Sequence, residues 1–285
     1  MATFSPLRYP GGKDKTYKYV NYLIKQSSIK TYIEPFAGGA AVALRLLINN
    51  DVENIIINDY DKGIYSLWFS ILYNSDELIK LIKDTEITMD EWYKQKTIQE
   101  NKNKENELTL GFSTLFLNRT NRSGIIKAGV IGGKNQDGNY LMDCRFNKMN
   151  LIDKINIISS HKNQIELYNL DAKDFIRKGI IKNRKSLTFF DPPYYNKGPD
   201  LYTNFYTHED HKDLADIIKN TMSDNIWIMT YDIHDEIEKL YKEYNYIKYS
   251  LNYSVALPTK GQEYMFFSDT IKSGEVSNYL NLVTK

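Results

Sequence analysis

The tetrapeptide Asp191-Pro192-Pro193-Tyr194 carries the residue types most suited to chemistry in this sequence, and it directly follows the apolar run SLTFF at 186–190. Two consecutive prolines fix an extended backbone that cannot continue in a sheet, so a strand is expected to end here. Open α/β sheets bind ligands at this edge. The Asp191 carboxylate and the Pro192 carbonyl would accept two N–H bonds while the Tyr194 ring stacks. The group predicts a site for a planar heterocycle with an exocyclic amine, and the alternative is a proline-rich turn.

A glycine turn and an acid follow two earlier expected strands, at 31–36 and 54–58. The turn lies at the end of the first strand and reads Glu34-Pro35-Phe36-Ala37-Gly38-Gly39. Glycine there lets the backbone approach a ligand closely. Asp59 ends the second strand, where a carboxylate can accept hydrogen bonds from ribose hydroxyls. The spacing is not the GxGxxG fingerprint, and an ordinary turn followed by an aspartate helix cap is the alternative.

Two further motifs combine aromatic or amide groups with cations. The sequence RYPGGK at 8–13 is not a P-loop, because Leu7 and Asp14 stand where glycine and Ser or Thr are needed. It can stack on one ring and pair with one carboxylate, or form a plain turn. The sequence NRTNRSG at 118–124, followed by Arg145, is dense in donors for base edges and phosphates. A solvated polar turn is its alternative.

Other candidates for chemistry fail. His208 and His211 resemble a metal pair, but they follow Thr207 at an expected helix start, so helix capping explains them better. We therefore predict no metal site. Cys144 is the single cysteine and has no nucleophile motif around it. A cytosolic setting is the expectation, since no disulfide, secretory signal or membrane span is expected.

The net charge of the 285-residue chain is +1, which by itself argues against a polyanionic partner. The sum conceals segments of opposite sign. Residues 1–30 hold six Lys or Arg against one acid, 119–148 hold six against two, and 191–245 hold twelve acids against five lysines. Three of the seven arginines fall within 119–148, and arginine suits bidentate contacts with phosphate or guanine. The distribution favours a nucleic-acid partner, although lysine-rich compositional drift is an alternative.

Strands alternate with helices over most of the chain. Beyond the first two strands, the pattern predicts strands at 165–168, 186–190 and 225–230, helices at 171–178, 208–222 and 232–241, and a terminal hairpin from 246–251 and 263–267. Such alternation predicts an α/β fold with a doubly wound, mostly parallel sheet.

The segment from 62 to 160 interrupts this rhythm. It begins with a helical pattern, continues through a polar stretch at 75–107 that reads as a solvated helix, and ends in a glycine-rich loop or hairpin at 119–147. A structureless loop of such length is implausible. We expect one domain built from 1–61 and 161–285, and an inserted, mainly helical domain at 62–160.

In this order, the motifs resemble those of the Dam-type, alpha-group DNA adenine-N6 methyltransferases. FSPLRYPGGK resembles the family's N-terminal cofactor motif, EPFAGG its glycine loop, NDYD its ribose-binding acid and DPPY its catalytic motif. NRTNRSG, with GGKNQDGNY and RFN after it, is similar to the DNA-reading segment. Pro10 and Tyr9 depart from the family pattern, where a small residue and Trp are common.

The resemblance implies a Rossmann-like methyltransferase sheet with an inserted DNA-recognition domain that contains a hairpin loop. It implies transfer of a methyl group from S-adenosyl-L-methionine to the N6 amine of adenine in duplex DNA, with base flipping. The catalytic residues would be Asp191, Pro192, Pro193 and Tyr194. The cofactor-binding residues would be Tyr9, Gly12, Lys13, Glu34, Phe36, Ala37, Gly38, Asp59, Asp171 and Asp191. The DNA-binding residues would be Asn118, Arg119, Asn121, Arg122, Ser123, Gly124 and Arg145.

The resemblance further implies a cytoplasmic enzyme, bacterial or phage-encoded, with double-stranded DNA as partner, a cognate restriction endonuclease as candidate partner and no membrane association. Four alternatives remain open: a cytosine-N4 methyltransferase, a methyltransferase for another amine such as protein glutamine, a non-catalytic DNA-binding subunit, and a dinucleotide oxidoreductase. The residues do not give the DNA target sequence or the oligomeric state.

Overall fold

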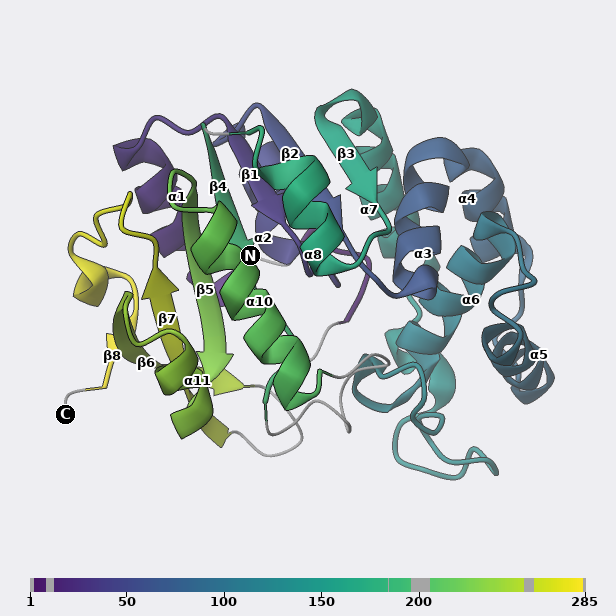
Figure 1. Cartoon of the computed structure of the whole chain (residues 1–285). Helices are drawn as coiled ribbons and strands as arrows, with labels where there is room; N and C mark the ends of the chain where they lie inside the picture. The colour runs from purple at the N-terminus through teal and green to yellow at the C-terminus, as the bar shows by residue number, and fades with distance from the viewer. Residues whose placement is uncertain (1–2, 9–12, 184, 196–205, 254–258, 284–285) are drawn as a thin grey trace.

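The computed structural model describes residues 3–8, 13–183, 185–195, 206–253 and 259–283. In this part of the chain, eight strands form one sheet in the order β3-β2-β1-β4-β5-β7-β6-β8 (Figure 1). The strands are β1 (Thr31–Glu34), β2 (Asn54–Asn58), β3 (Ile165–Tyr168), β4 (Ser186–Phe190), β5 (Ile226–Asp232), β6 (Asn245–Tyr253), β7 (Thr259–Phe267) and β8 (Asn281–Leu282).

The sheet is doubly wound, which confirms the predicted α/β class. Strands β1 to β5 pair in parallel, whereas β7 runs antiparallel to both β5 and β6. The chain builds β1, β2 and β3 outward on one side, and then β4 and β5 on the other. The order therefore reverses between β1 and β4. Such a switch point leaves a crevice at the carboxyl ends of the strands, where Glu34 and Asp191 lie.

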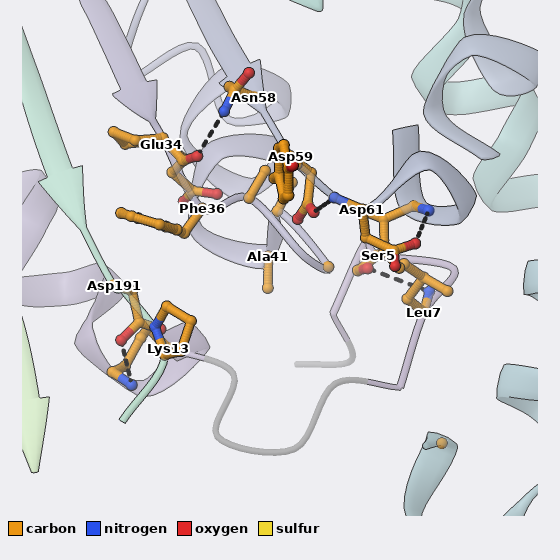
Figure 2. Close-up of a pocket in the computed structure, with 18 of the residues that line it drawn as sticks. Ser5, Leu7, Lys13, Glu34, Phe36, Ala41, Asn58, Asp59, Asp61 and Asp191 are labelled. Carbon is orange, nitrogen blue, oxygen red and sulfur yellow. Dashed lines mark hydrogen bonds and ion pairs between the residues drawn. The ribbon is translucent and has the colours of Figure 1, made fainter. Parts of the chain in front are cut away.

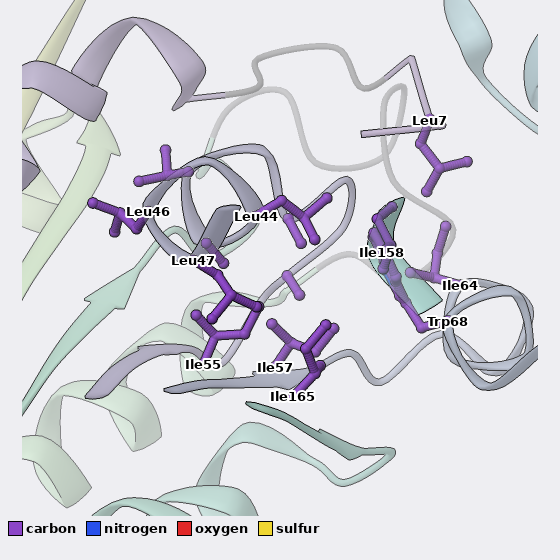
Figure 3. Close-up of a cluster of buried hydrophobic side chains, with 14 of the residues drawn as sticks. Leu7, Leu44, Leu46, Leu47, Ile55, Ile57, Ile64, Trp68, Ile158 and Ile165 are labelled. Atoms are coloured by element: carbon purple, nitrogen blue, oxygen red, sulfur yellow. The ribbon is translucent and has the colours of Figure 1, made fainter. Parts of the chain in front are cut away.

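Helices cover both faces of the sheet (Figure 1). One face carries α1 (Tyr17–Gln26), α2 (Ala41–Ile48), α3 (Lys62–Tyr73) and α7 (Lys148–Ser160), and the other carries α8 (Ala172–Phe175), α10 (His208–Thr221) and α11 (Asp235–Leu240). Because a strand alternates its side chains between faces, Ile55 and Ile57 join the first buried cluster, and Ile56 joins the second. Figure 3 shows Ile55 and Ile57 in the first cluster, which extends to Trp68 of α3. Strands buried on both faces read as continuous apolar runs, as these do.

The segment 62–160 is helical, with α4 (Ser75–Asp84), α5 (Met89–Glu100) and α6 (Glu107–Thr120) between α3 and α7. The glycine-rich stretch 121–147 has one isolated bridge, between Asn121 and Val130, and two short 3-10 turns. The predicted solvated helix at 75–107 is partly wrong, because Trp92 of α5 is buried and its Nε1 donates to Asn121 Oδ1 at 2.7 Å. In the described part of the chain, no helix is long and apolar enough to cross a membrane.

Helices α3 and α6 approach each other closely at Gly111. A β-carbon at this position would lie 2.5 Å from the Ser66 carbonyl oxygen and 2.6 Å from Ser70 Oγ. The backbone of α3 therefore occupies the space that any other residue would need, and glycine is required there by packing rather than by backbone conformation.

We expect Gly111→Ala to lower the free energy of unfolding by about 1–3 kcal/mol, because overpacking forces the two helices apart. Glycine-to-alanine changes inside an uncrowded helix instead stabilise by about 1 kcal/mol. Urea denaturation followed by circular dichroism measures the sign. Thr97→Ala, at an exposed position of α5, is the control and should leave stability within about 0.5 kcal/mol of wild type; a stabilised Gly111→Ala protein would contradict the close packing.

Candidate functional site

The glycine turn after β1 is fixed by hydrogen bonds to the end of β2. Ala37 N donates to the Asn58 carbonyl at 2.9 Å, and Gly38 N donates to Asp59 Oδ2 at 2.8 Å. Gly38 has a φ of +46°, in the left-handed region that glycine adopts without a steric penalty. The turn and the acid that the sequence analysis singled out are therefore parts of one structure.

Asp59 carries a carboxylate that two backbone amides orient. Besides Gly38 N, the Asp61 amide donates to Asp59 Oδ1 at 2.9 Å. Burial, followed by the nearby Asp61 carboxylate, raises the pKa of Asp59 to about 7. The group therefore changes its charge near neutral pH.

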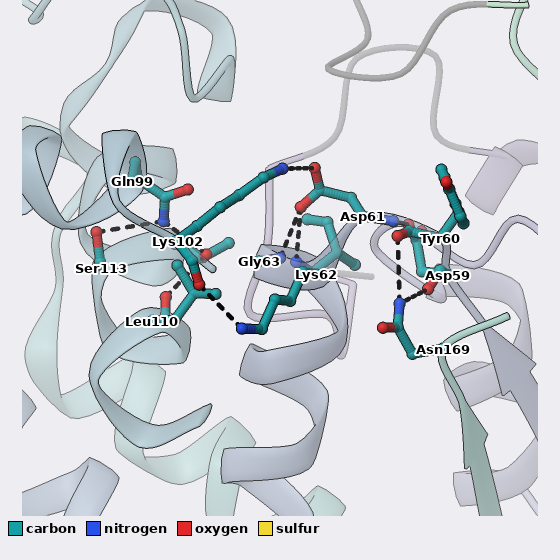
Figure 4. Close-up of polar contacts among 12 residues, drawn as sticks. Asp59, Tyr60, Asp61, Lys62, Gly63, Gln99, Lys102, Leu110, Ser113 and Asn169 are labelled. Atoms are coloured by element: carbon teal, nitrogen blue, oxygen red, sulfur yellow. Dashed lines mark hydrogen bonds and ion pairs between the residues drawn. The ribbon is translucent and has the colours of Figure 1, made fainter. Parts of the chain in front are cut away.

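A chain of polar contacts joins this acid to the helical segment (Figure 4). The Asp61 side chain caps α3 by accepting from Gly63 N at 2.8 Å, and it also accepts from Lys102 Nζ at 3.3 Å. Lys62 Nζ donates to the Lys102 carbonyl at 3.0 Å. The turn between α5 and α6 is thus tied to the end of β2.

Asn58 was not singled out by the sequence analysis, although it holds three loops together. Its Nδ2 donates to the carbonyls of Pro35 and Leu170 at 2.9 and 3.0 Å, and its Oδ1 accepts from Leu170 N at 2.9 Å. The side chain is 1% exposed. A polar residue at the end of a buried, β-branched strand is the signal that could have identified it.

Asp191 is held at the end of β4 by one of its two carboxylate oxygens. Oδ1 accepts from Thr230 Oγ1 at 2.8 Å and lies 2.9 Å from Lys13 Nζ. Within the described residues, Oδ2 makes no hydrogen bond or ion pair, and the side chain is 27% exposed. Burial raises the pKa of Asp191 and Lys13 opposes that shift. One oxygen is therefore anchored and the other is presented to an incoming donor.

The rest of the tetrapeptide is buried. Pro193 lines the cavity described below, whereas Tyr194 lies beneath it and is 6% exposed. Lys13 Nζ donates to the Tyr194 hydroxyl at 2.8 Å, and that hydroxyl donates to Glu263 Oε1. Lys13 therefore lies at the tetrapeptide and pairs with the Asp191 carboxylate. Pairing of this motif's cation with a carboxylate was one of two alternatives in the sequence analysis. Tyr9 and Gly12 lie outside the described residues.

These groups surround one cavity of about 760 Å³, a size typical of small-molecule sites. Figure 2 shows Lys13 and Asp191 on one side and Asp59 and Asp61 on the other, with Phe36 between them. The cavity is lined also by Glu34, Ala37, Asp171 and Tyr206.

Three of these lining groups have defined surroundings. Asp171 caps α8 by accepting from Lys173 N at 2.9 Å. Burial raises the pKa of Glu34 to about 8, so this carboxyl is mostly protonated at neutral pH. Tyr206, which no sequence signal indicated, packs edge-on to Phe36 with ring centroids 5.9 Å apart.

The cavity suits a nucleoside with a charged tail. The Phe36 ring and the carboxylates of Asp59, after β2, and Asp171, before α8, provide stacking and hydrogen-bond acceptors for a base and a ribose. The residues present therefore fit an adenosine-containing cofactor.

The predicted DNA-reading segment separates into buried and exposed side chains. Asn118 and Asn121 are 2% and 0% exposed. Asn118 bonds to both backbone polar groups of Arg8 and to the Gly124 carbonyl, each at 2.8 Å. Asn121 accepts from Trp92 and donates to the carbonyls of Ile125 and Ile126. Both side-chain amides are hydrogen-bonded to other groups of the protein. The expectation that they contact DNA is therefore wrong for this conformation.

Arg119 and Gly124 also face inward. Arg119 lines the cavity, and its guanidinium donates to the Pro6 carbonyl through Nε at 2.7 Å and through Nη2. Burial, followed by Arg8, lowers the pKa of Arg119 to about 10. Gly124 is buried with a φ of +77° and lies against the Arg8 carbonyl.

Arg122, Ser123 and Arg145 are exposed. They are the members of the predicted DNA-reading set that a macromolecule can reach in this conformation.

The prediction that a capped helix begins after Thr207 is confirmed. Thr207 and Asp210 form a capping box at the start of α10, and His211 is buried with Nδ1 2.8 Å from the Tyr231 hydroxyl. Burial lowers the pKa of His211 to about 4. No cluster of metal-ligating side chains occurs among the residues that the structure describes.

Comparison with known proteins gives the family. Residues 9–255 match the D12 class of N6 adenine-specific DNA methyltransferases. The chain is 26% identical over 222 residues to the type II methyltransferase M.MjaIII of Methanocaldococcus jannaschii, covering 73% of this chain and 74% of that protein. It is 24% identical over 260 residues to the type II methyltransferase M.CviBI of Paramecium bursaria Chlorella virus NC1A, covering 88% and 91%.

Among solved structures, the rRNA methyltransferase aviRa of Streptomyces viridochromogenes aligns with a TM-score of 0.36 and 8% identity, over 92% of this chain and 87% of that one. A likeness this remote carries no argument. The family match spans most of the chain and includes the glycine turn, Asp59 and the tetrapeptide at 191–194. The chain belongs to the D12 class of N6 adenine-specific DNA methyltransferases, enzymes that use S-adenosyl-L-methionine as methyl donor.

Proposed function

We propose that this enzyme methylates the exocyclic N6 of an adenine that has been flipped out of duplex DNA at a specific sequence. The observation that carries the proposal is the geometry of Asp191, whose Oδ1 is anchored by Thr230 and Lys13 while Oδ2 is left for an external donor. The rigid Pro192-Pro193 backbone sets a carbonyl acceptor beside it. Two fixed acceptors suit the two N–H bonds of an adenine amine.

The adenine amine is a poor nucleophile because its lone pair is delocalised into the ring. Hydrogen bonds from the two N–H groups to Asp191 Oδ2 and the Pro192 carbonyl would draw the nitrogen toward a tetrahedral shape and localise the lone pair. S-adenosyl-L-methionine, when bound, would supply the methyl group: as the new bond to nitrogen forms, the bond between the methyl carbon and the sulfonium sulfur breaks, S-adenosyl-L-homocysteine leaves, and the amine loses one proton to solvent. The chain thus contributes positioning and electrostatic stabilisation.

For the cofactor, we propose contacts from Tyr9, Gly12, Lys13, Glu34, Phe36, Ala37, Gly38, Asp59, Asp171 and Asp191. Asp59 would accept from the ribose hydroxyls, Asp171 would lie near the adenine, and Phe36 would stack. The support is that the eight of these residues that the structure describes either line the cavity or hold a residue that does.

For DNA, we propose that 62–160 forms the recognition domain and that 1–61 with 161–285 forms the catalytic domain. The support is an exposed, arginine- and lysine-containing surface at 121–147, which includes Arg122, Lys127, Lys134 and Arg145. Flipping the target base costs a few kcal/mol of stacking. Stacking on Tyr194 would recover part of this cost, and because this residue is 6% exposed in this conformation, the proposal requires the face of its ring to become more accessible when DNA binds.

The type II names of both relatives support a further proposal, that the enzyme protects DNA against a cognate restriction endonuclease. Because such a pair acts on cellular DNA, the proposal implies action in the cytoplasm, by an enzyme that is bacterial or phage-encoded.

We expect Asp191→Ala to reduce methyl transfer by at least about 10³-fold, because the anchored acceptor of the amine is removed. Tritiated methyl transfer to DNA measures the rate, and sequencing that detects modified bases identifies the product as N6-methyladenine. DNA affinity should stay within about twofold, and Asp216→Asn, at an exposed position of α10, should be fully active. Methylation by the Asp191→Ala enzyme, or methylated cytosine as product, would refute the assignment.

The affinity for S-adenosyl-L-methionine should weaken as the pH falls through about 7. The pKa of Asp59 is raised to about 7, so the carboxylate that accepts from the ribose is ionised above this pH and becomes protonated below it. We expect a roughly tenfold increase in Kd between pH 8.5 and 5.5, the effect of weakening a hydrogen bond to a charged group. Isothermal titration calorimetry measures this change. Asp59→Asn should bind weakly at every pH, and an equally steep pH dependence in that variant would exclude Asp59 as the cause.

Replacing Arg122 or Arg145 by alanine should weaken DNA binding, because each change removes a cation that can pair with a DNA phosphate. The slope of log K against log salt should fall by about 1 for each phosphate that the variant no longer neutralises. Fluorescence anisotropy at several salt concentrations gives both quantities. Arg177→Ala removes an exposed arginine beyond α8 and serves as the control. An unchanged slope in both test variants would remove this surface from the proposed DNA interface.

A further inference from the structure

Glu263 is a buried carboxylate at the site, and it was not among the candidate site residues of the sequence analysis. It lies on β7, is 1% exposed, and comes from a strand 69 residues beyond Tyr194. Its Oε1 accepts from the Tyr194 hydroxyl and its Oε2 accepts from the Tyr249 hydroxyl. Its Oε1 also lies 3.4 Å from Lys13 Nζ. A carboxylate this deeply buried is costly unless it is paired and hydrogen-bonded, and here both conditions are met.

One of these partners, Lys13, also contacts Asp191. Lys13 Nζ contacts Asp191 Oδ1 at 2.9 Å and donates to the Tyr194 hydroxyl at 2.8 Å. One ammonium thus lies between two carboxylates and one phenol. If Glu263 were removed, Tyr194 would lose an acceptor of its hydroxyl, and Lys13 would lose one of the carboxylates that it contacts among the described residues.

The sheet offers a comparison within the same molecule. Glu238 of α11 also accepts hydrogen bonds from two phenols, those of Tyr246 and Tyr264, and lies near Lys248 at 3.6 Å. These phenols belong to the opposite face of the sheet from Tyr249. The two glutamates have the same kinds of hydrogen-bond partner but differ in burial, at 1% and 41% side-chain exposure, and of the two it is Glu263 that contacts Lys13 and Tyr194 beside Asp191.

We propose that Glu263 is a positioning residue for methyl transfer, which fixes the Tyr194 ring and holds the Lys13 ammonium against Asp191, with Tyr249 orienting its carboxylate. This inference rests on the proposed function of Asp191 and adds a residue that acts through others. Methyl transfer depends on the exact direction of attack, so small displacements of the tetrapeptide should reduce the rate of the chemical step rather than binding.

The charge of Glu263 gives a readout that a purely structural role would not change. Asp191 has Glu263 as a negative neighbour that raises its pKa and Lys13 as a positive neighbour that lowers it. Among the described residues, Glu34 and Tyr32 of β1 also interact electrostatically with Asp191. Replacing Glu263 by glutamine removes one negative charge, so the acid limb of the pH–rate profile should move to lower pH.

The test compares Glu263→Gln, Tyr249→Phe and the control Glu238→Gln with the wild-type enzyme. Single-turnover methyl transfer to adenine-containing duplex DNA gives the chemical rate, and calorimetry and anisotropy give the Kd for cofactor and DNA. Thermal unfolding shows whether each variant is folded. We expect Glu263→Gln to slow the chemical step by about 10- to 100-fold, as for the loss of one hydrogen bond to a charged group, with each Kd within about twofold. Tyr249→Phe should slow the step by about 10-fold without moving the pH profile, and Glu238→Gln should match wild type.

Each result decides the matter. A folded Glu263→Gln enzyme with the wild-type rate and pH profile would overturn the role of Glu263 while leaving that of Asp191 intact. If Glu263→Gln does not fold, Tyr249→Phe tests the inference instead, because this variant keeps the charge of Glu263 and its contacts with Lys13 and Tyr194. A wild-type rate in Tyr249→Phe would then overturn the inference. A Glu238→Gln enzyme slowed as much as Glu263→Gln would also overturn it. Absence of adenine methylation by the wild-type enzyme would instead refute the proposed function.

Discussion

The ion pair between Lys13 and Asp191 is the constraint on which the site depends. Lys13 is 6% exposed, and a buried ammonium without partners would lose its charge or unfold its surroundings. It therefore has to stay beside Asp191 and Glu263, which come from β4 and β7. Lys13, at the start of a short 3-10 helix (Lys13–Thr16), is thereby fixed at the carboxyl edge of the sheet beside the tetrapeptide. The electrostatic requirement of one side chain thus joins residues of three separate parts of the chain.

A second polar system fixes the other half of the cavity, and it works through the backbone. Asn58 joins the loops after β1 and β3, and Asp59 holds the Gly38 amide. The contact between Asp61 and Lys102 extends this system into the helical segment. The β2 side of the cavity and the helical segment 62–160 therefore share a hydrogen-bonded boundary. The buried apolar cluster, which runs from Ile57 of β2 to Trp68 of α3, is also continuous across it.

The strands were predictable because their chemistry is local. Runs such as SLTFF are buried on both faces and bounded by turn residues, so they can be recognised without knowing their neighbours. Helix α6 was not predictable from the sequence, because residues on every side of it are buried and the apolar period that marks a surface helix is absent. The burial of Trp92 was not predicted because it lies in a polar helix. Its indole donates a hydrogen bond to Asn121, a partner 29 residues away in the sequence. Motifs located Asp59 and Asp191, whereas Thr230 and Glu263 act through pairings between distant strands that no local pattern encodes.

The segment at 118–124 illustrates why residue type alone could not separate scaffold from interface. Asparagine and arginine are suited to base edges and phosphates, but asparagine also satisfies backbone groups where a loop leaves regular structure. Asn121 supplies two such bonds and a third to the Trp92 side chain at the end of α6, and these bonds hold the loop that contains Arg122 and Ser123. A surface that reads DNA needs its exposed donors held in fixed positions, and rigidity of this kind requires buried polar groups with all partners in place. The many amide and guanidinium groups at 118–124 therefore serve two purposes. Some form a buried hydrogen-bonded framework, and others are the exposed residues that this framework positions.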